Sequence, residues 1–389
     1  MRAGQVIGEA VGFVSAPVHS PASGTVRGVD LHPHPLGTAQ PAVEIETDGE
    51  DAWADGLAGL PDPFGAPPDE VRRRILDAGI VGMGGAAFPT HVKLSPPPDY
   101  EIDAILLNGA ECEPYLTADH RLMVEEPGKI LSGLRIILSL FGLSQGSVGV
   151  ERNKPDAIEI LDRLAREDGF ARVVPLRVKY PQGAEKQLVW SILGREVPSG
   201  ALPMAVGVVV QNVGTAAAIA EAVLAGRPLV ERVVTVTGPS VCEPKNLRVR
   251  VGTPLRHVLA LCGGLTDDAG LVIAGGPMMG IAQHDLDAPV TKGTSAILCL
   301  PSRMVRTASP GPCIGCGRCI EACPMGLSPT TIRTRIDHRL VEEADEWNAL
   351  DCIECGCCSY VCPALIPRVQ SIRYAKGEVM AWRRKHRQG

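Results

Sequence analysis

The chain has 389 residues, a formal net charge of −6 at pH 7 and 45% hydrophobic residues. This length allows two to four domains with cores of their own, and the hydrophobic content is ordinary for a globular protein. The acidic balance argues against a nucleic-acid-binding protein, because no basic domain offsets it. The first residues contain no apolar signal core and no run of about 18 apolar residues occurs, so the sequence predicts neither export nor a membrane span.

Residues 1–47 contain short segments of period-two alternation broken by glycine and proline, which predicts a small β-barrel or sandwich. The stretch 16–26 resembles a hairpin of a biotinyl- or lipoyl-type barrel, but its turn lacks the lysine that a carrier would need. Metal binding and an ordinary loop position are both open for three histidines: His19, His32 and His34. The acidic stretch 48–70, rich in proline and glycine, is predicted to be a linker.

From residue 71 to 228 the pattern changes to apolar strands that alternate with amphipathic helices. The predicted strands are 102–108, 147–150, 171–178 and 205–211. The predicted helices lie near 129–141, 155–167, 184–194 and 215–225. Apolar strands separated by helices predict a parallel sheet covered on both faces. In such sheets ligands bind beyond the carboxyl ends of the strands.

A glycine-rich segment runs from Gly79 to Lys93, with further glycines at positions 82, 84 and 85. Glycine lets backbone N–H groups approach a phosphate or a flat ring closely. Lys93 would add a cation for an anion bound in the same pocket. A tight turn is the other explanation of such a loop, so the segment alone does not define a site.

Polar segments follow three of the predicted strands. Asn108–Pro114 lies at the end of an apolar strand, where its three polar side chains could hydrogen-bond a ring edge or a ribose; a helix cap or turn is the alternative. Tyr180–Lys186 and Asn212–Thr215 each follow a strand and open a helix. Each is therefore either an N-cap or part of a site.

Residues 229–300 read differently, with predicted strands at 232–238, 247–252 and 271–280 and a helix over 255–262. This is a mixed pattern rather than a regular alternation of strand and helix. The following residues, 301–312, are predicted to be a short linker.

Cysteines recur at one spacing, C-x2-C-x2-C-x3-C-P, at 313–324 and again at 352–363. This is the spacing of the bacterial two-cluster ferredoxin, in which the fourth cysteine of each run ligates the other cluster. We therefore predict a first [4Fe–4S] cluster on Cys313, Cys316, Cys319 and Cys362. The second cluster is predicted on Cys323, Cys352, Cys355 and Cys358.

Structural zinc and disulfides are the other uses of such cysteines. Zinc sites usually show two separated C-x2-C pairs rather than three thiols in a row, and disulfides need an oxidising compartment. Cys357 lies inside the second run at a spacing that fits neither cluster. Four further cysteines occur singly and are predicted to be reduced core thiols: Cys112, Cys242, Cys262 and Cys299.

The insert 325–351 between the two cysteine runs is predicted to be helical, with its core at 330–339. The tail, 368–389, is basic, with one acid, Glu378. Its cations are Arg368, Arg373, Lys376, Arg383, Arg384, Lys385 and Arg387. This tail could dock on an acidic partner or on anionic headgroups. It could equally be a solvated helix end.

Several of these segments resemble the NADH-binding flavoprotein of respiratory complex I. Gly82–Lys93 resembles its flavin loop Gly-x-Gly-Gly-Ala-Gly-Phe-Pro-Thr-x-x-Lys, Asn108–Pro114 its Asn-x-x-Glu-x-Glu-Pro, and Asn212–Thr215 its Asn-Val-Glu-Thr. A fuller resemblance, over essentially the whole chain, is to the RnfC family of the Rnf (Rsx) ion-translocating electron transport complex. It rests on Gly82–Thr90, Asn108–Tyr115, Tyr180–Lys186, Gln211–Thr215, Gly275–Gly280 and the doubled cysteine motif.

The Rnf resemblance implies a multidomain α/β fold. Its parts are a small N-terminal β-barrel or hammerhead (1–47), a linker (48–70), a Rossmann-like FMN and NADH domain with a parallel sheet (71–228), a soluble-ligand-binding β-grasp domain (229–300), a linker (301–312), a two-cluster ferredoxin-like domain (313–367) and the basic tail (368–389). Gly275–Gly280 either lines the route from flavin to clusters or forms a turn. Members of that family carry more sequence before the barrel, so either the barrel is incomplete or the start is assigned too late.

The same resemblance implies non-covalent FMN held by Gly82, Gly84, Gly85, Ala86, Lys93, Asn108, Glu111, Gly183, Asn212 and Thr215. It implies NADH stacked over the flavin, in contact with Phe88, Glu113, Tyr180 and Glu185. Two positions depart from the complex I pattern. Ala87 replaces the second loop glycine, and Ala184 stands where complex I has one member of an acidic pair.

In function, the resemblance implies the electron-input component of the complex, which oxidises NADH through FMN and passes single electrons through two [4Fe–4S] clusters. The implied partners are the ferredoxin-like component of the Rnf complex and its membrane components, which would couple the transfer to ion transport. The chain would then be peripheral, on the cytoplasmic side of the inner (plasma) membrane. Two alternatives stay open: a cobalamin reductase of propanediol-utilisation microcompartments, and an iron–sulfur electron carrier without NADH activity.

Overall fold

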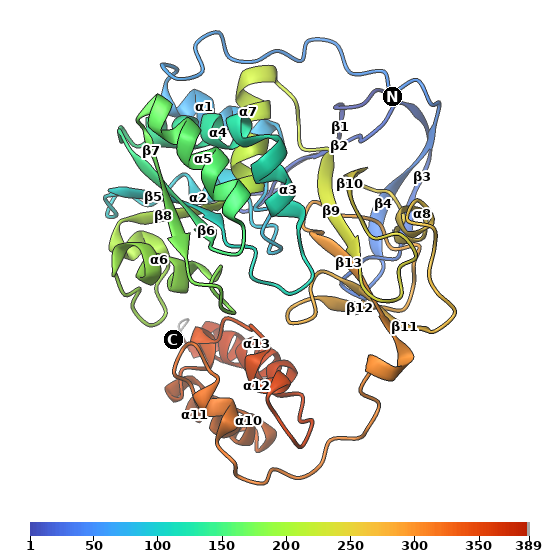
Figure 1. The fold of residues 1–389 in the computed structure, drawn as a ribbon, viewed down its shortest axis with the longest axis vertical. Helices are drawn as coiled ribbons and strands as arrows, with labels where there is room; N and C mark the ends of the chain where they lie inside the picture. Colours follow the sequence, from blue (N-terminus) through green and yellow to red (C-terminus); the bar gives the residue numbers. More distant parts are fainter. Residues whose placement is uncertain (387–389) are drawn as a thin grey trace. The chain divides into compact units, whose positions relative to one another are not determined.

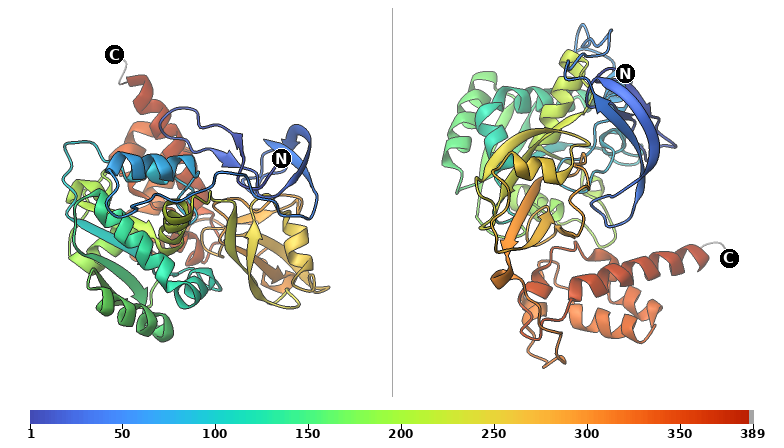
Figure 2. Two further views of the ribbon diagram at one scale, coloured as in Figure 1. Left: turned by 90° about the horizontal axis from the view of Figure 1, so that it is seen from above. Right: turned by 90° about the vertical axis from the view of Figure 1, so that its right-hand side faces the viewer.

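The structure, a computed structural model, describes residues 1–386 and divides into two compact units. The first unit comprises residues 1–197, 203–276 and 280–304. The second comprises residues 198–202, 277–279 and the described chain from 305 onward. Figures 1 and 2 show the elements of both units. The end of the predicted basic tail, including Arg387, lies outside the described residues.

The N-terminal region forms two antiparallel pairs of strands. Strand β1 (Val6–Gly8) pairs with β2 (Val18–His19), and β3 (Gly24–His32) pairs with β4 (Gln40–Thr47). The β-type segments predicted from alternation are therefore present, as two separate two-stranded sheets.

The stretch predicted as a linker, 48–70, is part of the first unit. The Leu60 side chain is buried and its backbone N–H donates to the carbonyl of Val223 at 2.8 Å. Helix α1 (Pro68–Asp77) already begins within this stretch, and it buries Val71 and Ile75. Before α1, this segment has little regular structure, as its proline and glycine content predicts, but contacts such as that of Leu60 fix it in place.

The central sheet of the first unit is parallel, as predicted. Its strands β5 (Ala104–Gly109), β6 (Gly146–Glu151), β7 (Ala171–Leu176) and β8 (Val208–Asn212) lie in the order β7-β6-β5-β8. Apolar side chains on these strands, such as that of Leu107, are fully buried. Continuous apolar runs of this kind are typical of a sheet covered on both faces.

The four predicted helices of this domain are α4 (Pro127–Leu140), α5 (Pro155–Asp168), α6 (Glu185–Leu193) and α7 (Val213–Ala225) (Figure 1). Proline at the first turn starts α4 and α5, and a left-handed glycine ends α5, α6 and α7. Helix α1 and three short helices were not predicted. The short helices are α2 (Thr90–Lys93), α3 (Ala118–Glu125) and η1 (Pro203–Val206).

A second sheet in this unit corresponds to the mixed pattern of residues 229–300. It contains β9 (Glu231–Thr237), β10 (Lys245–Arg250), β11 (Ala269–Ala274), β12 (Ile281–Gln283) and β13 (Ala296–Pro301), in the order β10-β9-β13-β11-β12. Only the β13–β9 pair within it is parallel. Helix α8 (Leu255–Ala260) packs into its core, and η2 (Ser302–Met304) follows β13.

The second unit is built from short helices and one long helix of 19 residues. These are α9 (Arg318–Glu321), α10 (Pro329–Asp337), α11 (Val341–Glu346), η3 (Ala349–Asp351), α12 (Cys357–Tyr360) and α13 (Arg368–His386). The predicted helical insert thus forms α10 and α11. The basic tail forms α13, which buries apolar residues such as Ile372 and Val379 within this unit. Among the described helices, none has both the length and the apolar content that crossing a membrane requires.

Close packing of α4 against α7 yields the first prediction. A Cβ atom at Gly133 would collide with the carbonyl oxygen of Ala216, whereas one at the exposed Gly128 of the same helix would meet nothing within 4 Å. We expect Gly133→Ala to lower the free energy of unfolding by about 1–3 kcal/mol, the usual cost of overpacking. Gly128→Ala is the control, and helix propensity makes it neutral or stabilising by up to about 1 kcal/mol. Equal urea midpoints for the two variants would contradict this packing.

Candidate functional site

Polar side chains gather at the carboxyl edge of the parallel sheet. Asn108 at the end of β5 and Asn212 at the end of β8 are directly paired across the two strands. Parallel strands present their carboxyl ends at one edge, where α/β folds bind ligands. Three loops meet these ends: the glycine-rich loop after α1, the loop after β5, and the loop before α6 (Figure 1).

The start of α7 holds the glycine-rich loop in place. The Asn212 side-chain oxygen accepts hydrogen bonds from the N–H groups of Gly214 (2.8 Å) and Thr215 (3.3 Å), so Asn212 is an N-cap. The hydroxyl of the fully buried Thr215 accepts a hydrogen bond from the Met83 N–H at 2.9 Å. The side-chain oxygens of Asn212 and Thr215 are therefore engaged with backbone N–H groups, at the start of α7 and at Met83 respectively.

The tip of the glycine-rich loop is open to solvent. Gly84, Gly85 and Ala86 are exposed, and within residues 1–386 their backbone N–H groups donate to no protein acceptor. Gly85 has a φ of 110°, which favours glycine, and Ala87 has a φ of 51°. Ala87 thus stands at a left-handed position, which explains why a glycine at this place suits the complex I motif.

Lys93 supplies the positive charge at this edge. It lies on α2, donates to the Val210 carbonyl at 2.6 Å and forms an ion pair with Glu185, the first residue of α6. Both side chains remain partly exposed. An anion bound at the loop would therefore meet an ammonium group that is already oriented.

Asn108 and Gly183 join the loops on either side of the strand. The Asn108 side chain donates to the Gly183 carbonyl at 2.7 Å and accepts from the Ala110 N–H at 3.1 Å. The Gly183 N–H donates to the Cys112 sulfur at 3.3 Å. A Cβ at position 183 would lie 2.5 Å from the Ala110 carbonyl oxygen, so glycine permits this close approach.

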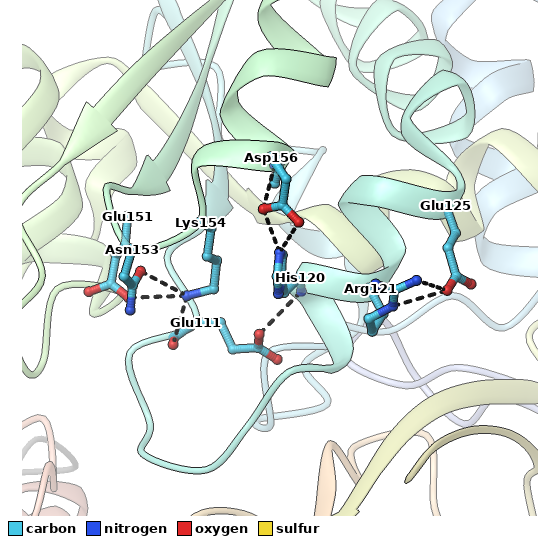
Figure 3. Close-up of polar contacts among 9 residues, drawn as sticks. Glu111, His120, Arg121, Glu125, Glu151, Asn153, Lys154 and Asp156 are labelled. Carbon is cyan, nitrogen blue, oxygen red and sulfur yellow. Dashed lines mark hydrogen bonds and ion pairs between the residues drawn. The ribbon is translucent and has the colours of Figure 1, made fainter.

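Glu111, in the loop after β5, binds the N-terminal end of α3. Its carboxylate accepts hydrogen bonds from the N–H groups of Asp119 (2.9 Å) and His120 (3.2 Å), and its carbonyl lies 3.4 Å from the Lys154 ammonium (Figure 3). Burial, with the nearby Asp119 carboxyl second, raises the pKa of Glu111 to about 8. The acid is therefore held in a structural position close to the sheet edge.

Three charged side chains near the site were not identified from the sequence: the buried Lys154 and Arg232, and the partly buried Asp119. Arg232 donates to the Met83 carbonyl at 3.0 Å and to the Lys292 carbonyl at 2.5 Å, and burial lowers its pKa to about 10. Asp119 accepts a hydrogen bond from the Asn212 side chain at 2.6 Å. In the sequence Arg232 follows Glu231 at the start of an apolar strand, so the pattern did not distinguish it from an ordinary strand-end charge.

The side chains predicted to meet NADH lie on the same loops. Phe88 is 41% exposed and follows the loop tip, and Tyr180 is partly buried ahead of α6. Glu113 lies against Gly276, since a Cβ at that glycine would collide with its carboxylate. The end of β11 in the second sheet thus borders the loop after β5.

The cysteines of the second unit line two separate cavities. One, of about 190 Å³, is lined by Cys313, Cys316, Cys319 and Cys362. The other, of about 20 Å³, is lined by Cys323, Cys352, Cys355, Cys357 and Cys358. The fourth cysteine of each run therefore lies with the first three of the other run. Within residues 1–386 no three His, Cys, Asp or Glu side chains converge closely enough to hold one metal ion.

Local backbone geometry and hydrogen bonds shape both thiol groups. Left-handed Gly317 and Gly356 occupy equivalent places before α9 and α12. The Cys319 sulfur lies 3.1 Å from the Thr330 hydroxyl, and the Cys352 sulfur accepts from the Glu354 N–H at 3.4 Å. Sulfur ligands of iron–sulfur clusters commonly receive hydrogen bonds of this kind, so the donor set fits such clusters.

The four single cysteines differ in burial. Cys262 and Cys299 are buried core thiols as predicted, and burial raises the pKa of Cys299 to about 12. For Cys242 the prediction was wrong, because this residue lies exposed in the turn after β9. Cys112 is partly buried and accepts the hydrogen bond from Gly183 described above.

Family models match four successive parts of the chain. The Nuo51 FMN-binding domain matches residues 75–221, and the SLBB domain matches residues 233–282. The RnfC barrel sandwich hybrid domain matches residues 1–50, and a 4Fe-4S dicluster domain matches residues 306–363.

Two solved structures of NAD+-reducing [NiFe]-hydrogenase share the fold. The H2-reduced form has a TM-score of 0.56 at 17% identity and covers 82% of this chain and 64% of its own. The air-oxidized form has a TM-score of 0.50 at 21% identity, with coverage of 62% and 48%. At these identities the similarity is one of fold.

The fold, the loop at the sheet edge and the cysteine module together define a component of the flavin and iron–sulfur oxidoreductase class. Curated relatives specify the family. The RnfC-type component of the Na(+)-translocating ferredoxin:NAD(+) oxidoreductase complex of Acetobacterium woodii is 49% identical, over 98% of this chain and 86% of its own. Its proton-translocating counterpart in Clostridium ljungdahlii is 48% identical (97% and 83%), and the counterpart in the ion-translocating oxidoreductase complex of Rhodobacter capsulatus is 45% identical (97% and 73%). The chain belongs to the RnfC family of Rnf complexes.

The buried carboxyl at Glu111 yields a pH prediction. Its pKa rises from 4.5 to about 8 on folding, so between these values the folded chain keeps a proton that the unfolded chain has lost. Stability should therefore fall as pH rises from about 5 to about 8, and Glu111→Gln should reduce that slope. Burial also raises the pKa of the neighbouring Asp119, which contributes a slope of the same sign. Urea midpoints measured across this range test it. Glu125→Gln, at an exposed carboxylate paired with Arg121, should leave the slope unchanged; identical slopes for the two variants would refute the assignment.

Proposed function

We propose that this chain is the electron-input component of an ion-translocating oxidoreductase complex. NADH is oxidised at the sheet edge of the first unit, and electrons leave through the cysteine module. When bound, FMN converts the two-electron chemistry of NADH into single electrons, which [4Fe–4S] clusters carry onward. The observation that carries the proposal is the open Gly84–Ala86 tip at the sheet edge, in a chain whose doubled cysteine runs line two separate cavities.

The proposed FMN contacts divide into two groups. Gly84, Gly85 and Ala86 offer backbone N–H donors, and Lys93 offers a cation, to a phosphate or to the polar edge of the ring. The remaining residues shape the pocket, since their side-chain groups or backbones are engaged in holding the loops: Gly82, Asn108, Glu111, Gly183, Asn212 and Thr215.

NADH is proposed to approach from the side of Phe88. The exposed ring of Phe88 offers an apolar face, and Tyr180 and Glu113 lie on the neighbouring loops. The Glu185 carboxylate forms an ion pair with Lys93. A hydrogen bond from a ribose hydroxyl to this carboxylate would therefore be made in addition to the ion pair. Ala184 reduces the local negative charge compared with an acidic pair.

Two [4Fe–4S] clusters are proposed, one in each cysteine-lined cavity. Cys313, Cys316, Cys319 and Cys362 would hold the first, and Cys323, Cys352, Cys355 and Cys358 the second. Cys357 lies in the second cavity as a spare thiol.

The acceptors are proposed from the family. The relatives are named as parts of complexes that translocate Na+ or protons and use ferredoxin and NAD+. We infer that this chain hands electrons to the ferredoxin-like component and to the membrane components of an Rnf complex, and that it lies at the cytoplasmic surface of the membrane. These names favour this function over the cobalamin reductase. A carrier without NADH activity is an outcome that the experiments below distinguish.

A set of substitutions at the loop tests flavin binding. Thr215→Val keeps the shape of the side chain but leaves the buried Met83 N–H without an acceptor, which typically costs about 1–3 kcal/mol. We expect the FMN dissociation constant to rise about tenfold or more, with Thr215→Ser restoring it. Lys93→Met should weaken FMN binding similarly. Lys129→Met, at a partly exposed lysine of α4 that pairs with Glu221, should not. Quenching of FMN fluorescence measures each constant; unchanged affinity in Thr215→Val and Lys93→Met would refute the site.

Iron content tests the grouping of the thiols. In the anaerobically reconstituted full chain, Cys362→Ser should perturb the signal of one cluster and spare the other, because Cys362 lines only the first cavity. Cys357→Ser is the matched control from the same cysteine run and should retain all the iron of the parent protein. Loss of iron in Cys357→Ser with none in Cys362→Ser would reverse the assignment.

A further inference from the structure

Arg368 points its guanidinium into the larger cysteine-lined cavity. It is the first residue of α13, and only 3% of it is exposed. It lines the cavity together with Cys313, Cys316, Cys319 and Cys362, and its Nη2 lies 3.5 Å from the Cys313 sulfur. Its Nε is buried and has no acceptor among the described residues.

A buried guanidinium is strongly destabilising unless anions surround it. The groups that can carry negative charge around Arg368 are the thiols of this cavity. Arg333, a second cation that acts on the Cys313 thiol, is paired with Asp337 at 3.1 Å. An anionic cluster in this cavity would compensate the charge of the buried guanidinium. Because water is excluded from Arg368, the attraction between the two charges would be little screened.

The smaller cavity has a different electrostatic surrounding. Lys376 donates to the Cys352 carbonyl at 2.9 Å and to Glu354 at 2.6 Å, and Arg373 donates to Glu354 at 2.7 Å. Both cations thus share one carboxylate, and the Lys376 ammonium is directed at a carbonyl rather than at a sulfur. Arg373 is also 39% exposed, so solvent screens it.

We propose that Arg368 raises the reduction potential of the cluster held by Cys313, Cys316, Cys319 and Cys362 above that of the other cluster. Reduction adds one electron to a cluster, without breaking a bond, and the extra negative charge is stabilised by the adjacent guanidinium. Local charge and hydrogen bonds to the sulfurs are among the factors that set such potentials. The first electron to enter the module then rests on this cluster. The inference depends on the proposed function, because it requires both clusters.

The test is a potentiometric titration of the full chain with both clusters in place, followed by EPR. We expect Arg368→Met to lower the reduction potential of one cluster by ~59 mV. This corresponds to a tenfold smaller equilibrium constant for its one-electron reduction. Arg368→Lys, which keeps the charge, should retain most of the parent value. Arg373→Met is the control and should shift neither cluster by a comparable amount. The shifted signal should be the one that Cys362→Ser perturbs.

The outcomes separate this inference from the function on which it rests. Two clusters with unchanged potentials in Arg368→Met would overturn the inference and leave the proposed function intact. A shift confined to the cluster that Cys362→Ser spares would also overturn it. If Arg368→Met fails to assemble, Arg368→Gln and Arg368→Lys decide: equal potentials in these two variants would exclude an effect of the charge. Failure of the parent chain to take up two clusters would refute the proposed function itself.

Discussion

The backbone N–H and the backbone carbonyl of Met83 are both hydrogen-bonded to buried side chains. The Met83 N–H donates to Thr215 at the start of α7, and the Met83 carbonyl accepts from Arg232 at the start of the second sheet. Both partners are buried, so water competes for neither bond. The exposed tip, Gly84–Ala86, begins directly after this fixed residue. The backbone just before the glycine tip is therefore held in one position, which favours a preorganised loop.

The Arg232 bond joins the parallel-sheet domain to the second sheet. Arg232 belongs to β9, yet its guanidinium reaches the flavin loop and the Lys292 carbonyl, and a Cβ at the neighbouring Gly293 would lie 3.2 Å from the Gly85 carbonyl oxygen. The charge of Arg232 is balanced in part by Asp119, which also holds the Asn212 amide. The second sheet therefore contributes to the pocket as a support for the loop, in addition to any route it offers between cofactors.

Much of this could be predicted from local patterns. The strands and longer helices of the α/β domain follow from apolar runs and 3.6-residue periodicity, and the spacing of the cysteines already predicts the exchange of Cys323 and Cys362 between the two groups. Helix α3 escaped prediction because its eight residues mix polar and apolar side chains without a clear apolar face. The stretch 48–70 was predicted to be a linker because composition reports the lack of regular structure and not the burial of Leu60.

The contacts that fix the sites could not be predicted, because they join residues far apart in the chain. Met83 and Arg232 are 149 positions apart, and Cys313 and Arg368 are 55 apart. In the sequence Arg368 is one cation of a basic tail, and only the fold shows that its side chain turns inward. The segment Asn212–Thr215 was likewise open between cap and ligand contact, and the structure shows Asn212 as the cap and Thr215 bound to the Met83 N–H.

The central claim is that electrons pass from NADH through FMN to the clusters of this one chain. The most direct measurement is to add NADH anaerobically to the protein loaded with FMN, iron and sulfide, and to follow the flavin absorbance together with the EPR spectrum. The account predicts bleaching of the flavin band accompanied by the signal of reduced clusters. Bound flavin that NADH leaves unchanged would contradict it, and would point to a carrier that receives its electrons from another donor.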